Sequence, residues 1–169
     1  MIAIQPTAEQ IVRWLEQVPD PEIPVISVID LGIVRHVGWG DDGACIVTIT
    51  PTYSGCPATT VIGQAITAAL GRHGIDRVRL AIQLSPAWSS DWLSEDGKAK
   101  LREYGIAPPA VQTIALASIG RGSRSRLSIP CPRCASADTS CISQFGSTPC
   151  KSLYRCNDCL EPFDYFKCH

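Results

Sequence analysis

The stretch "TPTYSGCPATTVIGQAITAAL" (50–70) runs from the end of an expected β-strand into an expected helix and places a cysteine directly before a proline. Proline is favoured at the first helical position, so Pro57 predicts a helix start with Cys56 as its N-cap. The apolar positions of this helix form one continuous stripe: 58, 61, 62, 65, 66 and 69. The stretch therefore predicts a strand-to-helix turn with Cys56 at its corner.

Two strands are expected before this turn and one after it. "IVRHV" (33–37) and "ACIVTIT" (44–50) flank the turn residues "GWGDDG" (38–43), which predicts a β-hairpin. "DRVRLAIQL" (76–84) alternates between apolar and polar residues and predicts a third strand.

Two further helices complete the first domain. Thr7 and Gln10 form a capping-box pattern that opens a helix, and Pro19 closes it. Ser94 is expected to cap a last helix over roughly 95–104, ended by Gly105. The order α-β-β-α-β-α predicts an α+β domain over residues 1–116, in which helices pack on a small sheet.

The composition changes after this domain. "ASIGRGSRSRLSIP" (117–130) has the Gly, Ser and Arg content of an exposed linker. Residues 131–169 hold seven of the nine cysteines and are expected to contain too few apolar side chains for a core of their own. We therefore expect a linker over 117–130 and a separate module over 131–169 that needs a metal to fold.

Two C-x-x-C pairs mark this module as a metal site. "CPRC" (131–134) and "CNDC" (156–159) are separated by 21 residues, and the segment between them predicts a β-hairpin that turns near Gly146. Four thiolates suit tetrahedral Zn²⁺ and leave no open coordination position. We expect a structural zinc ribbon with four ligands: Cys131, Cys134, Cys156 and Cys159. An iron–sulfur cluster on the same thiolates and a pair of redox motifs are the alternatives.

The other cysteines of the tail carry no clear pattern. Cys141 and Cys150 lie on opposite arms of the expected hairpin, so a cross-strand pair is conceivable. Cys168 and His169 stand at the chain end, where a frayed terminus is more common than a metal ligand.

Cys56 has two interpretations. Free N–H groups and the dipole at a helix N-terminus stabilise a thiolate, which suits a nucleophile or a soft-metal ligand. A small buried residue that closes the turn is the plainer interpretation, since cysteine is often buried. His36 and His73 are the candidate bases for a Cys-dependent enzyme, and neither lies in a recognisable motif.

The acidic, proline-rich segment "DPEIPVISVID" (20–30) has the same ambiguity. Its carboxylates Asp20, Glu22 and Asp30 could help a nearby thiolate to hold iron. Aspartates in such segments more often bond to the local backbone, which would make Asp20 and Asp30 turn caps and Glu22 a solvated side chain.

The bulk composition excludes several classes. The chain has 169 residues, 45% of them hydrophobic and 18% charged, as in an ordinary globular protein. It contains neither a signal-peptide pattern nor an apolar run long enough for a membrane helix, so a cytoplasmic protein is expected. A net charge of −1 argues against nucleic-acid binding.

Together, "DPEIPVISVIDLGIVRHV" and "TPTYSGCPA" resemble the domain of SufT-type iron–sulfur assembly factors. With "SPAWSSDWLSEDGKAKLREYGIAPP" and the tail "ISQFGSTPCKSLYRCNDCLEPFDYFKCH", nearly the whole chain is similar to the PaaD (also called PaaJ) family of phenylacetyl-CoA epoxidase components. This resemblance implies an accessory component, without a catalytic step of its own, of a multicomponent di-iron oxygenase in aerobic phenylacetate catabolism.

The resemblance also implies roles for individual residues. The motif cysteine of the family falls on Cys56, and its acidic motif falls on Asp20 and Glu22. The chain would handle iron or an iron–sulfur cluster transiently, assist maturation of the other epoxidase subunits, and hold structural zinc in its ribbon. A purely structural docking subunit is the alternative, and a homodimer is a further option.

Overall fold

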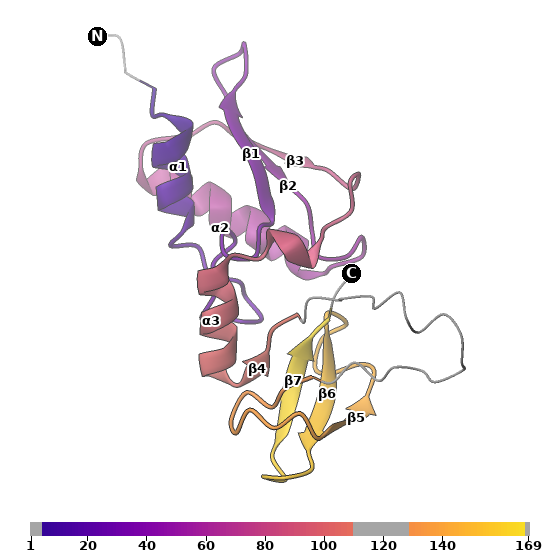
Figure 1. The fold of residues 1–169 in the computed structure, drawn as a ribbon. Helices are drawn as coiled ribbons and strands as arrows, with labels where there is room; N and C mark the ends of the chain where they lie inside the picture. Colours follow the sequence, from indigo (N-terminus) through magenta and orange to yellow (C-terminus); the bar gives the residue numbers. More distant parts are fainter. Residues whose placement is uncertain (1–4, 110–128, 168–169) are drawn as a thin grey trace, which may run out of the picture. The chain divides into compact units, whose positions relative to one another are not determined.

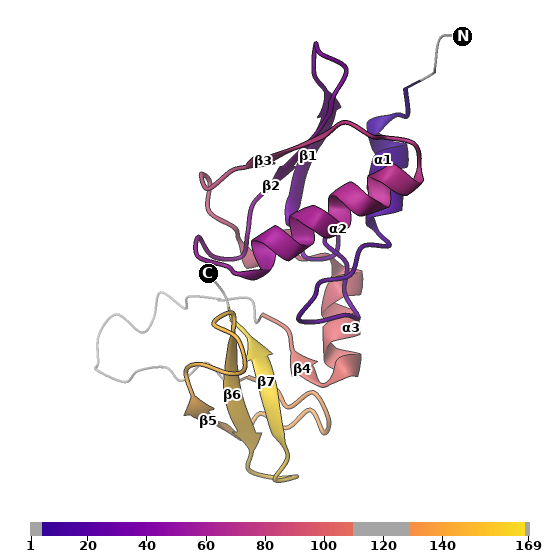
Figure 2. The same cartoon turned by 180° about the vertical axis from the view of Figure 1, so that it is seen from behind.

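The computed structural model describes residues 5–109 and 129–167, which form two compact units. The first ends at Lys100 and the second begins at Leu101. Figures 1 and 2 show the elements of each unit from opposite sides. Among the described residues, no helix is both long and apolar enough to cross a membrane.

The first unit has the expected order of elements. A three-stranded sheet is formed by β1 (Val34–Trp39), β2 (Cys45–Ile49) and β3 (Val78–Ile82), in that spatial order. Its helices are α1 (Ala8–Leu15), α2 (Ala58–Arg72) and the short η1 (Ser90–Trp92), and α3 (Glu95–Tyr104) continues into the second unit. The predicted α+β class is confirmed.

Strand pairing explains why α2 is needed. β1 and β2 pair antiparallel through a short turn, whereas β2 and β3 pair parallel. A parallel pair needs a crossover connection, and α2 supplies it. Gly63 lets α2 approach β3 closely, because a Cβ atom at this position would lie 2.7 Å from Cδ1 of Leu80.

The first helix follows its sequence signal. The Thr7 Oγ1 atom accepts a hydrogen bond from the Gln10 backbone N–H at 3.2 Å, and Gln10 Oε1 accepts one from the Thr7 N–H at 2.9 Å. This reciprocal capping box fixes the start of α1. Ile11 and Leu15 on its inner face are fully buried, so the helix is held by core packing as well as by its cap.

The proline-rich segment is folded around a buried carboxylate. Asp30 accepts hydrogen bonds from the Ser27 N–H (3.0 Å) and the Ser94 hydroxyl (3.0 Å), and it forms an ion pair with Lys100 Nζ at 2.7 Å. Burial alone would raise the pKa of Asp30, but Lys100 and the hydrogen bonds outweigh it and hold the pKa below its usual range. Asp30 therefore ties the segment to the start of α3.

The second unit is a four-stranded sheet in the order β4-β7-β6-β5. It comprises β4 (Ile106–Ala107), β5 (Thr139–Ser143), β6 (Lys151–Cys156) and β7 (Pro162–Phe166). The expected β5–β6 hairpin is present and antiparallel.

The division of the chain differs from expectation at β4. This strand pairs with β7 and so belongs to the second unit, not to the first. Most of the predicted linker over 117–130 lies outside the described residues, so the boundaries at 116 and 130 stay predictions.

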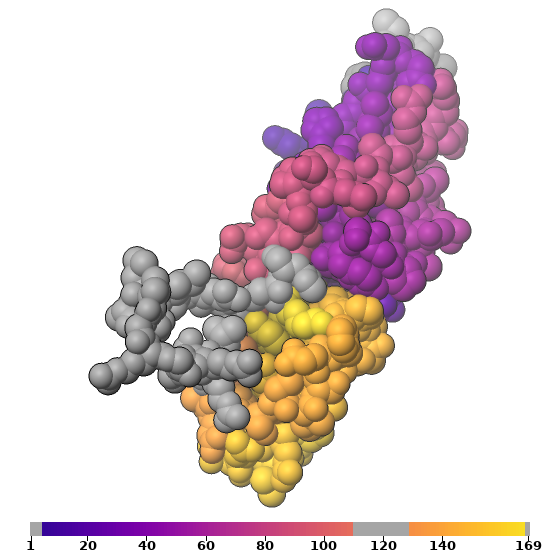
Figure 3. All heavy atoms as spheres, turned by 90° about the vertical axis from the view of Figure 1, so that its right-hand side faces the viewer, coloured from indigo at the N-terminus to yellow at the C-terminus, as the bar shows by residue number. Residues whose placement is uncertain are grey.

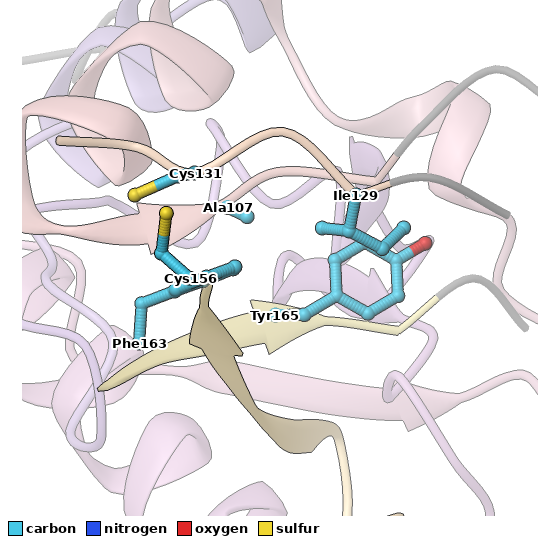
Figure 4. Packing of buried hydrophobic residues seen from close by; sticks show 6 residues of the cluster. All are labelled: Ala107, Ile129, Cys131, Cys156, Phe163 and Tyr165. Carbon is cyan, nitrogen blue, oxygen red and sulfur yellow. The ribbon is translucent and has the colours of Figure 1, made fainter. Parts of the chain in front are cut away.

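The second unit has a small apolar core, which the cysteine-rich segment over 131–169 does not build alone. Its buried members are Ala107, Ile129, Cys131, Cys156, Phe163 and Tyr165. Figure 4 shows these side chains gathered between the strands and the chain that carries Cys131. In the space-filling view, the residues of β5 to β7, orange to yellow, pack against one another (Figure 3). The ribbon therefore combines apolar packing with its cysteines, because β4 and Ile129 add apolar side chains from outside the 131–169 segment.

We expect Asp30→Ala to lower the free energy of unfolding by about 2–3 kcal/mol, because it leaves buried donors without their acceptor. The contribution of Asp30 should be present above its unfolded pKa of about 4 and be lost as the pH falls through its lower folded value. Chemical denaturation at several pH values measures both effects.

Glu95→Ala is the matched control, because this carboxylate is 87% exposed and pairs with Lys98 on the surface of α3. It should change the stability by less than about 0.5 kcal/mol. Equal losses for the two variants would contradict the role given to Asp30.

Candidate metal centre

Four cysteines of the second unit converge on one point. The Sγ atoms of Cys131, Cys134, Cys156 and Cys159 all lie within 4.8 Å of one another. Cys131 and Cys134 precede β5, Cys156 ends β6, and Cys159 lies in the turn to β7. In Figure 4 the sulfur atoms of Cys131 and Cys156 point toward each other. The hairpin therefore brings the two C-x-x-C pairs together, as their spacing predicted.

The sulfur spacing fits a tetrahedral zinc ion. With Zn–S bonds of about 2.3 Å, the edges of a regular tetrahedron are about 3.8 Å long. The Cys131–Cys159 and Cys134–Cys156 sulfur distances are 3.8 and 3.5 Å. Four thiolates would fill every position around the ion, so the donor set suits a structural rather than a catalytic zinc.

The backbone gives both knuckles the same shape. The N–H of Cys131 donates to the Ser136 carbonyl at 2.9 Å, and the N–H of Cys156 donates to the Glu161 carbonyl at 3.0 Å. The residue after each second cysteine has a positive φ: 61° at Ala135 and 64° at Leu160. The sequence did not indicate this left-handed turn, because neither position is the glycine or asparagine that usually marks one.

Polar bonds also join the two knuckles. Asn157 Nδ2 donates to Asp138 Oδ1 at 2.7 Å, and the Asn157 N–H donates to the Asp138 carbonyl at 2.9 Å. The Ser136 hydroxyl donates to the Asp158 carboxylate on the opposite knuckle. These bonds lie on the exposed side of the cluster and hold the two turns in register.

The thiols of the cluster differ in acidity. The backbone N–H of Cys159, whose nitrogen lies 3.4 Å from the Cys156 Sγ, is the main cause that lowers the pKa of Cys156 to about 7. The Ser136 N–H acts to lower the pKa of Cys134, but the Cys156 thiol and burial outweigh it and raise the pKa to about 12. A divalent cation is therefore needed to remove the proton from Cys134 near neutral pH.

Cys56 lies in the turn between β2 and α2, one residue farther from the helix than predicted. Pro57 is the N-cap and α2 begins at Ala58, so the prediction that Cys56 is the N-cap is wrong. The Cys56 carbonyl still accepts the Thr59 N–H at 3.2 Å, and its own N–H donates to the Tyr53 carbonyl at 3.1 Å. Pro57 has helical φ and ψ of −65° and −24°, and this N-cap makes no side-chain hydrogen bond to the helix N–H groups.

The structure gives Asp20 a local bonding role. Asp20 is buried, and its Oδ1 accepts the N–H groups of Glu22 (2.9 Å) and Ile23 (2.8 Å). Glu22 is half-buried. Among the described residues, a metal-binding group of three or more ligands is found at the four ribbon cysteines. Cys56, Asp20 and Glu22 do not belong to this group. The roles of these three residues in iron handling remain predictions.

The surplus cysteines do not form the conceivable cross-strand pair. Cys141 is exposed and lies opposite Tyr154, whereas Cys150 is buried, and in the described part of the chain no disulfide joins them. Cys168 and His169 lie outside the described residues.

We expect Cys156→Ser to lose the bound zinc and unfold the ribbon, because zinc binding to such sites contributes about 10–16 kcal/mol to folding at neutral pH. Metal analysis and circular dichroism measure these changes. Cys141→Ser is the control: this exposed cysteine of the same sheet should keep one zinc per chain. A Cys156→Ser chain that still holds one zinc would contradict the assignment.

Zinc affinity should fall as the pH is lowered, because protons compete with zinc for the sulfur atoms. The fall should become steeper below about pH 7, where the Cys156 thiolate also binds a proton. The proton on Cys134 should be released when the metal binds at neutral pH. Calorimetric titration in buffers of different ionisation enthalpy counts the released protons. An affinity that stays constant between about pH 6 and pH 8 would contradict this account.

Comparisons with known proteins cover both units. A family model described as "Iron-sulfur cluster assembly protein" matches residues 8–79, and one described as "PaaD zinc beta ribbon domain" matches residues 117–167. The crystal structure of a domain of unknown function, DUF59, from Bacillus anthracis aligns with a TM-score of 0.51 at 25% identity. The alignment covers 56% of this chain and 90% of that chain.

Two curated relatives illustrate the same division. "Fe-S protein maturation auxiliary factor" of Porphyromonas gingivalis (strain ATCC BAA-308 / W83) is 38% identical over 96 residues, 56% of this chain and 90% of the relative. A subunit of the "Putative 1,2-phenylacetyl-CoA epoxidase" of Escherichia coli (strain K12) is 48% identical over 165 residues, 96% of this chain and 94% of the relative.

The E. coli relative spans nearly the whole chain, so it matches both of the units that the structure shows. The four-cysteine cluster falls within the residues that match the PaaD zinc ribbon. The chain therefore belongs to the PaaD family of 1,2-phenylacetyl-CoA epoxidase subunits.

Proposed function

We propose that this chain is a cytoplasmic accessory subunit of a phenylacetyl-CoA epoxidase system and assists maturation of the metal centres of the other subunits. The first unit would carry iron or an iron–sulfur cluster on Cys56, and the zinc ribbon would dock the recipient subunit. The chain itself would perform no step of the epoxidation. The names of the E. coli and P. gingivalis relatives support this combination of roles.

The position of Cys56 is the observation on which the proposal depends. Its side chain is part-exposed, and it lies beside Ser54, Gly55 and Pro57, which are all exposed. The first turn of α2, which the structure describes throughout, contains no acidic residue, and its N-cap makes no side-chain hydrogen bond. An anionic sulfur ligand is favoured beside such a helix end, where the backbone N–H groups carry partial positive charge.

The lack of a gathered ligand set suggests a carrier rather than a permanent holder. Among the described residues, Cys56 does not belong to a group of three or more ligands near one point. A metal on Cys56 would therefore need further ligands from another molecule, such as the recipient subunit. Thiolate suits iron–sulfur clusters, and incomplete coordination would favour their release to a site with more ligands.

The zinc ribbon suits docking because it presents exposed apolar side chains on a sheet. Ile142 on β5 and Phe145 in the following turn are 56% and 68% exposed. The Lys167 ammonium lies 4.5 Å from the centroid of the Phe145 ring, which is close enough for a cation–π interaction. Exposed aromatic and aliphatic residues beside a charge are typical of recognition surfaces.

We expect Cys56→Ser to reduce the iron and sulfide content of the co-expressed epoxidase subunits to the level found without this chain. The oxygen of serine is a poor ligand for a cluster that favours sulfur. Anaerobic metal and sulfide analysis of the purified subunits measures the effect, together with the iron bound to this chain.

Cys141→Ser is the matched control, an exposed cysteine that should leave client metal content unchanged. Both variants should keep one zinc per chain and still co-purify with the epoxidase subunits. Full client metal content with Cys56→Ser would overturn the maturation role and favour the purely structural docking subunit.

A further inference from the structure

An apolar groove of about 560 Å³ lies along the open edge of the sheet in the first unit. Its lining comprises residues of three elements: Ile49 of β2, Leu80 and Ile82 of β3, and a stripe along α2 that includes Gly63, Gln64 and Thr67. Among the described residues that line it, none is charged. This groove is separate from the zinc cluster of the second unit.

The backbone of β3 is open on the side away from β2. β3 is the last strand in the sheet order. Its hydrogen bonds to β2 include those from the Cys45 N–H to the Arg77 carbonyl and from the Gln83 N–H to the Ile49 carbonyl. Because these bonds to β2 use odd-numbered residues of the β3 segment, the N–H and carbonyl groups of Val78, Leu80 and Ile82 face outward. A further strand can therefore pair with β3.

The same three residues have their side chains on the α2 face. Leu80 and Ile82 line the groove with α2, and Val78 shares their face because side chains alternate along a strand. Ile82 is 61% exposed, and Leu84, two residues farther on, is 55% exposed. The β3 edge therefore presents the apolar groove together with apolar side chains that could pack into the same groove of a second molecule.

The other edge of the sheet is protected in the usual way. β1 carries the exposed charged or polar side chains of Arg35 and His36 and has a register irregularity between Val34 and His36. Such features discourage a second chain from pairing with an edge. On β3 the charged residue Arg79 points to the opposite face, where it pairs with Asp42 at 2.6 Å. The described residues of β3 on the α2 face therefore carry no charge that would discourage pairing.

We propose that β3 pairs antiparallel with β3 of a second copy of this chain around a two-fold axis at Leu80. A two-fold interface must be self-complementary, and this surface supplies both the groove and the apolar side chains on one patch. In this register Val78 lies opposite the partner's Ile82, and Arg79 lies opposite the partner's Ala81. No like charges then face each other directly across the new pair.

The dimer is tested with the zinc-loaded, full-length chain by light scattering after size exclusion. We expect twice the 18.2 kDa mass of the chain for the wild type. Ile82→Lys should be monomeric, since it places a charge in the apolar interface. Its zinc content and circular dichroism should match the wild type because the side chain is exposed in the single chain.

Ile142→Lys is the matched control, an exposed isoleucine on β5, which is also an edge strand. It should remain dimeric. A wild-type chain that is monomeric at about 100 µM would overturn the proposal. A dimer that persists in Ile82→Lys would also overturn it, whether or not Ile142→Lys dissociates the dimer.

Hydrogen exchange gives an independent test of the pairing. The amides of Leu80 and Ile82 point away from β2, so they should be protected only when a second strand accepts their hydrogen bonds. We expect protection of Leu80 in the wild type and its loss in Ile82→Lys, with the Gln83 amide, bonded to Ile49, protected in both. Fast exchange of Leu80 and Ile82 in the wild type would show that the edge is free and overturn the proposal.

Discussion

The parallel pairing of β2 with β3 is the constraint on which the first unit depends. Parallel neighbours cannot be joined by a tight turn, so the chain must leave the sheet after Ile49, cross over as α2 and return. The crossover creates the turn that exposes Cys56, requires the close approach at Gly63, and leaves β3 at the edge beside the groove. The candidate carrier cysteine and the candidate pairing edge are thus consequences of one topological choice.

The second unit is organised around sulfur instead. Two similar turns, each closed by a backbone bond and containing one left-handed residue, bring four sulfur atoms within 4.8 Å of one another. The small apolar cluster that contains Cys131 and Cys156 lies beside them. Apolar packing and metal ligation share these two cysteines, so the sheet and the metal site depend on each other.

The two units differ in the metal chemistry that their cysteines suit. A closed set of four thiolates holds its ion firmly and offers no position for exchange. A part-exposed cysteine at a helix start, without a gathered set of further ligands among the described residues, is suited to brief contact with a metal that passes onward. The proposed function therefore combines a permanent structural ion in one unit with a transient cargo on the other.

Local sequence patterns were enough to predict the three helices and three strands of the α-β-β-α-β-α order, the β5–β6 hairpin, the capping of α1 by Thr7 and the gathering of the four ribbon cysteines. Short-range periodicity and ligand spacing are local properties. Neither β4 nor β7 was predicted. The motifs around Cys56 indicated a SufT-type domain, and the stretch over 85–109 together with the cysteine-rich tail indicated the PaaD family. Four other features are set by the tertiary structure: β4 pairs with the ribbon sheet, Ala135 and Leu160 adopt positive φ, Asp30 forms an ion pair with Lys100, and β3 is an unpaired edge strand of its sheet. Most of these depend on which residues meet across long sequence separations, and pairing of that kind is set by the packed fold rather than by local pattern.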